Sequence, residues 1–432
     1  MKLVKSLMLG SVAGLAAVAG AQAADLPVKK AAPVEYVRVC STYGAGFFYI
    51  PGTDTCLRVG GRVRAQYIYG EPVTRAQDAT GFYIRGRVQL DARTATAYGL
   101  LRSVVRLELT RTTGTAFRGF GGTGGAATGA QVAEAFVQFG GLTAGRVVSF
   151  FSNGDLPTGH FGTLRFDDAP DTETLAYTFT FGNGFSATLA IEDGIERREG
   201  IVNAANFAPL PYGGQRMPDV VGNLKYTGTW GTAQLSGAVH QIRDNTLAGG
   251  ALGLFDNYDT EYGFAIGLQA GINLPMIAPG DAAWISLEYA NGAAAYLDGG
   301  IAGTQISPFN VFGNGSRLLV DASWNPVTGQ LEKSRDWSIA GGFRHYWTPE
   351  VRTNIFGSYL NADSGLATPS LSDFREYRIG GNVIWSPVAG LDLGVEVIYA
   401  NNQLRHQAQL LPAGVRNNDT GWEGRIRVQR DF

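Results

Sequence analysis

The 432-residue sequence contains little cysteine, methionine or histidine, with 2, 4 and 4 residues of each. Beyond the N-terminus it also lacks any run of roughly 20 consecutive apolar residues, which a membrane-spanning helix needs. A mean hydropathy of −0.02 is too polar for a helical membrane protein. The mature chain is therefore either soluble or enters a membrane as β-strands.

The scarcity of histidine also limits catalysis and metal binding. No histidine stands in a nucleophile motif or at metal-ligand spacing. The glycine-rich run Gly121–Gly129 lacks the Lys-Ser/Thr ending of a phosphate loop, so we interpret it as a flexible loop. We predict no enzyme, no cofactor and no metal, and a hydrolase is the best enzymatic alternative. The four histidines are His160, His240, His345 and His406.

The N-terminus predicts export. Lys2 and Lys5 precede an apolar run from Leu7 to about Ala19, and Ala21-Gln22-Ala23 fits a cleavage site. We predict a signal peptide over residues 1–23. Its removal takes away two positive charges and no negative ones, so the net charge of −2 becomes −4. A mildly acidic protein gives no reason to expect nucleic acid as a partner.

The two cysteines, Cys40 and Cys56, enclose a short loop from Ser41 to Thr55. Disulfides persist in the oxidising compartments that exported proteins reach. We predict a bridge, which would stabilise the fold by about 3 kcal/mol in the chain-entropy view. Two buried free thiols are the alternative.

From Leu57 to the C-terminus, polar and apolar residues alternate in segments of about ten residues. Successive strand residues point to opposite faces, so each segment is a strand with one polar and one apolar face. A soluble β-sandwich also alternates. However, it would not usually place three or four charges on one face of strand after strand. We therefore predict an all-β fold, an antiparallel transmembrane β-barrel. The clearest segments are Leu57–Tyr69, Phe82–Arg93, Leu101–Thr110, Leu391–Tyr399 and Trp422–Phe432.

The links between strands alternate between short and long, as in bacterial barrels. Counting them gives about sixteen strands, with both chain ends on one side. Asn291 to Ser334 is the least clear stretch, because Arg317 to Trp324 could form an extra hairpin arm and change the count. Aromatic residues such as Tyr67, Trp347 and Trp422 cluster near predicted strand ends, where membrane–water interfaces favour them. The short links include Gly140-Gly141, Gly182–Gly184, Thr227–Gly231, Thr348-Pro349 and Ser386–Gly390; the long ones include Arg111–Gly129, Phe150–Thr172, Gly194–Arg216, Asn245–Asn257, Asn361–Ser372 and Asn402–Asn418.

Three stretches give the chain a family resemblance. They are Glu35–Cys40 continuing at Thr55–Gly61, then Ala135–Arg146 followed by Ser149-Phe150-Phe151, and the terminal Arg427–Phe432. In these the chain resembles the general porins of alphaproteobacterial outer membranes, of the rhizobial and Brucella type. The cysteine segment is the most specific of them.

This resemblance implies a sixteen-stranded, integral outer-membrane barrel with a third loop folded into its lumen, and a homotrimer. It also implies a water-filled channel for passive diffusion of ions and small hydrophilic solutes, surrounded by outer-membrane lipid and lipopolysaccharide. Phe432 resembles the terminal signal that the barrel-assembly machinery reads. The expected organisation is a signal peptide over 1–23, a periplasmic segment over 24–56 containing the cysteine loop, and the barrel over 57–432.

One patch of wall and one loop are the candidate pore residues. Arginines on the polar face of three consecutive strands should line the lumen, because a charge facing lipid at mid-depth costs about 2–4 kcal/mol. Alternatively, some of these arginines could face solvent at the rim of the barrel or bind lipopolysaccharide phosphates. The third loop should set acids against them and create a transverse field across the constriction. The arginines are Arg62, Arg64, Arg85, Arg87, Arg102 and Arg106; the acids are Asp155, Asp167, Asp168, Asp171 and Glu173.

Other interpretations remain open. The acidic loop could be a solvated segment, or Asp167, Asp168 and Asp171 could hold Ca²⁺ through their oxygens. The channel could be selective for a sugar or an anion rather than general. The long loops could also serve an adhesin or phage receptor, a role compatible with a pore.

Overall fold

The computed structural model describes residues 38–72, 75, 78–116, 125–162, 164, 170–205, 209–245, 259–297, 319–366, 372–405 and 418–432. The expected signal peptide and residues 24–37 lie outside these ranges. Among the described residues, no helix is long and apolar enough to cross a membrane.

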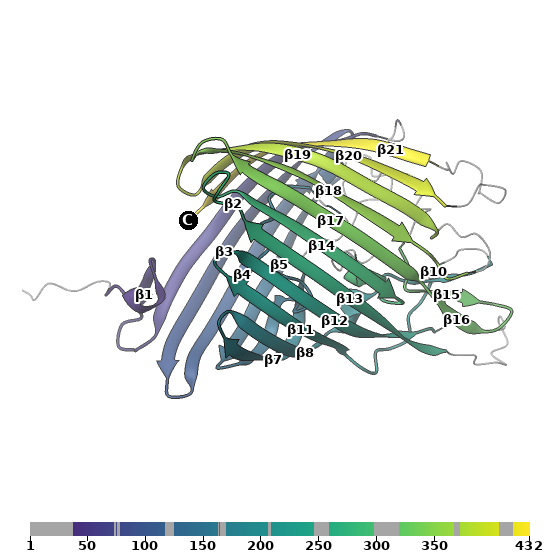
Figure 1. Ribbon diagram of the computed structural model, residues 1–432, viewed down its shortest axis with the longest axis horizontal. Coiled ribbons are helices and arrows are strands. Elements are labelled where there is room, and N and C mark those ends of the chain that lie inside the picture. Colours follow the sequence, from purple (N-terminus) through teal and green to yellow (C-terminus); the bar gives the residue numbers. More distant parts are fainter. Residues whose placement is uncertain are drawn as a thin grey trace, which may run out of the picture.

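Within these ranges, sixteen strands form one closed antiparallel barrel (Figure 1). Each strand pairs with the next barrel strand along the chain, and the last pairs with the first through Arg62↔Asp431 and the pairs that follow it. The predicted fold and the count of about sixteen strands are confirmed. The barrel strands are β2 (Cys56–Gly70), β3 (Thr80–Thr96), β4 (Gly99–Thr113), β5 (Ala126–Phe139), β6 (Leu142–Val148), β7 (Asp171–Gly182), β8 (Phe185–Glu192), β11 (Asp219–Gly228), β12 (Gly231–Arg243), β13 (Thr260–Asn273), β14 (Ala282–Asn291), β17 (Arg335–Tyr346), β18 (Val351–Ala362), β19 (Phe374–Val388), β20 (Leu391–Leu404) and β21 (Asn418–Asp431).

The remaining described elements are short. Four 3₁₀ turns lie in the links: η2 (Ser41–Tyr43), η3 (Gly114–Ala116), η4 (Gly194–Arg197) and η6 (Ala294–Tyr296). A small second sheet contains β9 (Ile201–Asn203), β10 (Pro209–Leu210), β15 (Ala322–Asn325) and β16 (Gln330–Lys333). The β15–β16 hairpin pairs with β9 rather than with a barrel strand. Within its described residues, 291–297 and 319–334, the stretch Asn291–Ser334 therefore adds no further strand to the barrel.

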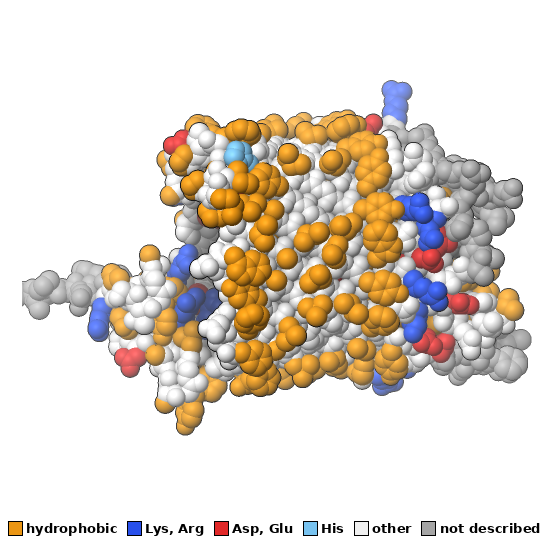
Figure 2. Space-filling model, in the orientation of Figure 1, with side chains coloured by type: hydrophobic (Ala, Val, Ile, Leu, Met, Phe, Trp, Pro, Cys, Tyr) orange, Lys and Arg blue, Asp and Glu red, His pale blue; other side chains and the backbone are white. Residues whose placement is uncertain are grey.

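The apolar parity of the strands faces outward. On β2, Val63 and Tyr67 are exposed, whereas Gln66 on the other parity is buried. Figure 2 shows the result: apolar side chains spread over the outer wall, and charged side chains gather toward the ends of the barrel. Because lipid tails cannot solvate polar groups, this pattern places the polar parity in the lumen.

Short turns join the strands at one end of the barrel. The β7–β8 turn is Asn183-Gly184, with backbone φ angles of 50° and 85°. Such a turn needs positive φ at both positions, which Asn and Gly tolerate best. The strand ends that flank the longer links lie at the opposite end, and the C-terminus lies at the short-turn end (Figure 1). The predicted alternation of short and long links is confirmed.

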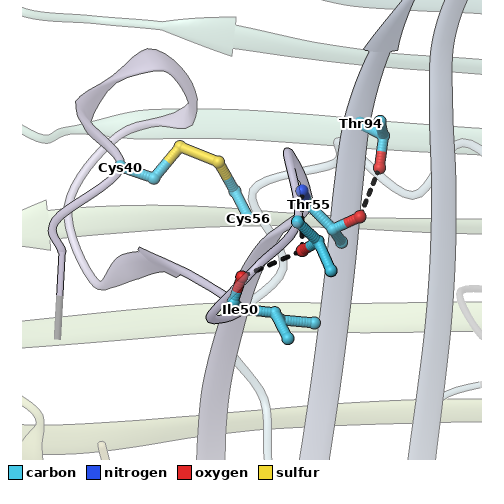
Figure 3. The surroundings of a disulfide bond; sticks show 6 residues. Cys40, Ile50, Thr55, Cys56 and Thr94 are labelled. Carbon is cyan, nitrogen blue, oxygen red and sulfur yellow. Dashed lines mark hydrogen bonds between the residues drawn. A yellow bond between two sulfur atoms is a disulfide. The ribbon is translucent and has the colours of Figure 1, made fainter. Parts of the chain in front are cut away.

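The predicted disulfide joins Cys40 to Cys56, with Cα atoms 6.0 Å apart (Figure 3). It ties η2 and β1 (Phe47–Tyr49) to the start of β2, where β1 pairs with the first residues of that strand. Phe47 and both cysteines are buried together. The disulfide therefore fixes a small hairpin at the short-turn end of the barrel.

Candidate pore and constriction

All six predicted arginines lie on the inward face of β2, β3 and β4. The register sets Arg62 opposite Arg87 and Arg64 opposite Arg85. Gln66, on the same face of β2, accepts hydrogen bonds from Arg427 of β21, so β21 continues this wall across the point of closure. We call the inward face of β21 and β2–β5 the arginine wall. The side chains of its paired arginines on β2–β4 are 20–25% exposed, whereas Arg425 and Arg427 of β21 are buried.

Acids within the same wall compensate most of these charges. Glu108 accepts from Arg85 and Arg87 at 2.9 and 2.5 Å. Asp91 pairs with Arg102 at 3.0 Å. Similar pairs join Arg106 to Glu134 at 2.6 Å and Arg62 to Asp431 at 2.5 Å. These wall acids were not among the predicted site residues, although Asp91 and Glu108 stand on the polar parity of their strands.

Arg64 and Arg427 differ from the other arginines of the wall in their hydrogen-bond partners. Arg64 donates through Nε to the amide of Gln429 at 2.8 Å. The guanidinium of Arg427 donates to Gln66 and lies 3.9 Å from the centre of the Phe161 ring. Within the described residues, neither makes an ion pair with a carboxylate. Arg427 was not predicted from the sequence as a wall residue, because β21 becomes a neighbour of β2 only when the barrel closes.

The third external loop spans residues 149–170; its described part (residues 149–162, 164 and 170), called L3, lies inside the barrel. At its start, Glu192 of β8 accepts from Ser149 Oγ at 2.7 Å and from the Phe150 N–H at 2.8 Å. Asn223 of β11 and Gln234 of β12 donate to the Phe150 carbonyl at 2.6 and 3.1 Å. The first part of L3 is therefore fixed to the inner face of β8–β12.

Farther along, L3 reaches the other side of the bore. The Glu396 carboxylate of β20 accepts from the N–H groups of Phe161 and Gly162, both at 2.5 Å. Asn382 of β19 donates to the Gly159 carbonyl at 2.8 Å. Gly162 packs so tightly that a Cβ there would lie 2.5 Å from Ile398. Buried carboxylates that accept backbone N–H groups form strong hydrogen bonds, so this contact holds L3 against the wall.

Among the described residues, the predicted acids Asp155, Asp171 and Glu173 do not form one group facing the arginines. Asp155 turns to β11, where Lys225 pairs with it at 2.8 Å and Thr227 donates to it. Burial opposes ionisation of Asp155, but the hydrogen bond and charge of Lys225 outweigh it and hold the carboxyl pKa below its usual range. Asp155 is therefore an anion already neutralised by the wall behind it.

The other four predicted acids do not share one location in the structure. Asp167 and Asp168 lie outside the described residues. Asp171 begins β7 on the same parity as Glu173 and interacts electrostatically with both Arg106 and Arg146. Glu173 pairs with Arg146 at 2.7 Å. It shares its parity on β7 with the exposed apolar residues of that strand, which places it on the outer face.

Comparison with known proteins agrees with this architecture. A family model described as "Porin subfamily" matches residues 25–422. The chain is 30% identical to porin Omp2b of Brucella suis biovar 1 (strain 1330) and to porin Omp2b of Brucella abortus (strain 2308), over 99% of each chain in both cases.

Among solved structures, the fold is similar to the outer-membrane channel DcaP of Acinetobacter baumannii. The TM-score is 0.61 at 14% identity, covering 89% of this chain and 99% of that one. The anion-selective porin of Comamonas acidovorans is similar with a TM-score of 0.51 at 12% identity, covering 88% of this chain and 100% of that one. The chain therefore belongs to the porin family of the family model and the Brucella relatives, and it is an integral outer-membrane β-barrel channel for passive diffusion.

Proposed function

We propose that the channel is a general pore for ions and small hydrophilic solutes, that these pass along the arginine wall, and that anions pass more readily than cations. The observation that carries the proposal is the pair Arg64 and Arg427, which lack a carboxylate partner among the described residues. Arg427 contacts Phe161 of L3, so these uncompensated charges lie beside the loop that crosses the bore.

Charges at a constriction act at close range, where little water screens them. The wall acids already neutralise Arg62, Arg85, Arg87, Arg102 and Arg106 in large part. Arg64 and Arg427 should therefore contribute most of the residual positive potential. Asp171, with Asp167 and Asp168, is proposed to oppose this potential from the L3 side and to limit the preference for anions.

The reversal potential of the purified protein in a planar bilayer under a KCl gradient tests this directly. We expect Cl⁻ to be preferred, and Arg64→Gln with Arg427→Gln to remove most of the preference. Arg93→Gln is the matched control, because Arg93 is paired with Asp91 at 2.8 Å. Preference for K⁺, or an equal shift in the control, would contradict the proposal.

Liposome swelling separates a general pore from a selective one. Rates that fall smoothly with solute size across sugars and amino acids support the general pore. A rate that saturates with one sugar or anion would instead establish a selective channel.

Processing, assembly and quaternary structure are further parts of the proposal. We propose that residues 1–23 are removed on export, that residues 24–56 lie on the periplasmic side, and that the barrel forms homotrimers in outer-membrane lipid and lipopolysaccharide. Phe432 pairs its backbone with Gly61 while its side chain stays exposed, which leaves the ring accessible to the barrel-assembly machinery. Deletion of Phe432 should lower the outer-membrane yield, and unheated gels should show a trimer that dissociates on heating.

A further inference from the structure

A row of small apolar residues crosses the inner face of the barrel where a water-filled bore would favour polar ones. It is continuous through the register of six neighbouring strands, β7 to β14. Every member is buried, with at most 4% exposure. We call it the apolar row; its members are Ala176, Ala190, Val221, Ala238, Ala265 and Ala290.

The row belongs to the lumen side. Along β11, Val221 shares its parity with Asn223, whose side chain binds the L3 carbonyl of Phe150. Val220 and Leu224, on the other parity of β11, are exposed on the outer wall. Leaving apolar surface in water costs about 25 cal/mol per Å², so a buried row inside a pore requires a cover.

The cover comes from the sixth external loop, L6 (residues 292–334). Its segment Ala293–Leu297 is buried throughout and packs in one cluster with the apolar row. Phe151 of L3 belongs to the same cluster, and its ring centre lies 4.7 Å from that of Tyr296. L6 therefore enters the bore and rests on the first turn of L3.

Polar contacts fix the segment in this position. Tyr296 donates its hydroxyl to Asp219 of β11 at 2.7 Å, and Asp219 also binds His240 of β12 at 2.8 Å. Asp321 accepts from the Ala294 N–H and from the Glu199 N–H, both at 2.8 Å. Buried hydrogen bonds to carboxylates are costly to break, because the group left behind stays desolvated. L6 is thus attached both to the wall and to the fourth external loop (residues 193–218).

We propose that Ala293–Leu297 is a second constriction element, which fills the part of the bore lined by β7–β14 on the external side of L3 and confines solutes to the arginine wall. Its role rests on the proposed pore function. Tyr296 is its key positioning residue, since its ring contacts L3 and its hydroxyl binds the wall.

Thiol accessibility tests whether L6 covers the wall in a membrane. The two native cysteines are bridged and leave no other thiol in the chain. Ala238→Cys in the apolar row should resist a charged, water-soluble thiol reagent in bilayer-embedded protein. Gln138→Cys is the control, because Gln138 belongs to the arginine wall, and it should react readily. Equal labelling of the two would overturn the proposal.

Conductance tests whether the covered space limits flow. In Tyr296→Ala protein, Ala238→Cys should become reactive and the single-channel conductance should rise by about one half or more, as expected for a widened aqueous path. Tyr296→Phe keeps the ring and should give a smaller increase in single-channel conductance. This variant still tests the proposal if the alanine variant folds poorly. Reactive Ala238→Cys with unchanged conductance would contradict a constricting role.

The labelling result is independent of current. Protein that inserts in bilayers but never conducts would refute the proposed pore while Ala238→Cys still reported whether L6 covers the wall. The two failures are therefore distinguishable.

Discussion

The two halves of the inner wall differ in what covers them. The arginine wall carries arginines on β2–β4 that remain partly exposed to solvent, whereas Arg425 and Arg427 of β21 are buried and donate to the Phe161 carbonyl of L3. The wall from β7 to β20 carries buried residues, because L3 and L6 lie against it. A barrel with sixteen strands would leave a wide bore. Covering one half makes the aqueous path eccentric and forces solutes past one set of charges.

The largest change should come from releasing L3 on the covered half. Glu396→Ala removes the acceptor of the Phe161 and Gly162 N–H groups and of Asn382. Hydrogen bonds to a charged group contribute about 1.5–3 kcal/mol each, so L3 should leave the wall. We expect conductance to rise by about a factor of two, with added current noise.

Single-channel recording measures this change, and Glu396→Gln is the matched control because its amide keeps one acceptor oxygen. It should change conductance less than the alanine variant. Identical, wild-type conductance in both variants would show that L3 is held by other contacts.

On the arginine wall, removing the acid Glu108 should increase the preference for anions. Glu108→Gln takes away the carboxylate that Arg85 and Arg87 share and leaves both cations uncompensated. The ratio of Cl⁻ to K⁺ permeability should rise by about twofold, since charge at close range sets ion preference. Reversal potentials measure it. A shift toward K⁺ would mean that ions do not pass this face.

The smallest effect should come from the Asp155–Lys225 pair, which joins L3 to β11 and has side chains 52% and 23% exposed. Such pairs contribute about 0–1 kcal/mol. The pKa of Asp155 is lowered in the folded protein, so its contribution is complete above the ordinary value of 3.8 and disappears as pH falls through the folded pKa. Lys225→Met should therefore alter the heat stability of the barrel slightly at pH 7, and the difference from wild type should shrink as the pH falls through the folded pKa of Asp155. A difference that does not depend on pH would contradict this ion pair.

The sequence predicted the features that depend on neighbouring residues and neighbouring strands. Alternation identified the barrel, and shared parity placed Arg62 and Arg87 on one wall. It did not reveal how loops cross the lumen, because those contacts join residues far apart in the chain. Asp155 was expected to face the arginines and instead binds Lys225, a partner 70 residues later. Ala238 and Ala265 could have indicated the covered wall, because they are small apolar residues on the face of their strands that points into the lumen. A strand face lined by water usually carries polar residues.

We expect the aqueous path to follow the arginine wall alone. Bilayer recordings of Gln89→Cys and Ser236→Cys proteins during addition of an anionic thiol reagent test it most directly, because Gln89 lies on the arginine wall and Ser236 on the covered wall. The account predicts stepwise loss of current for Gln89→Cys and steady current for Ser236→Cys. Equal block of both, or block of Ser236→Cys alone, would contradict it.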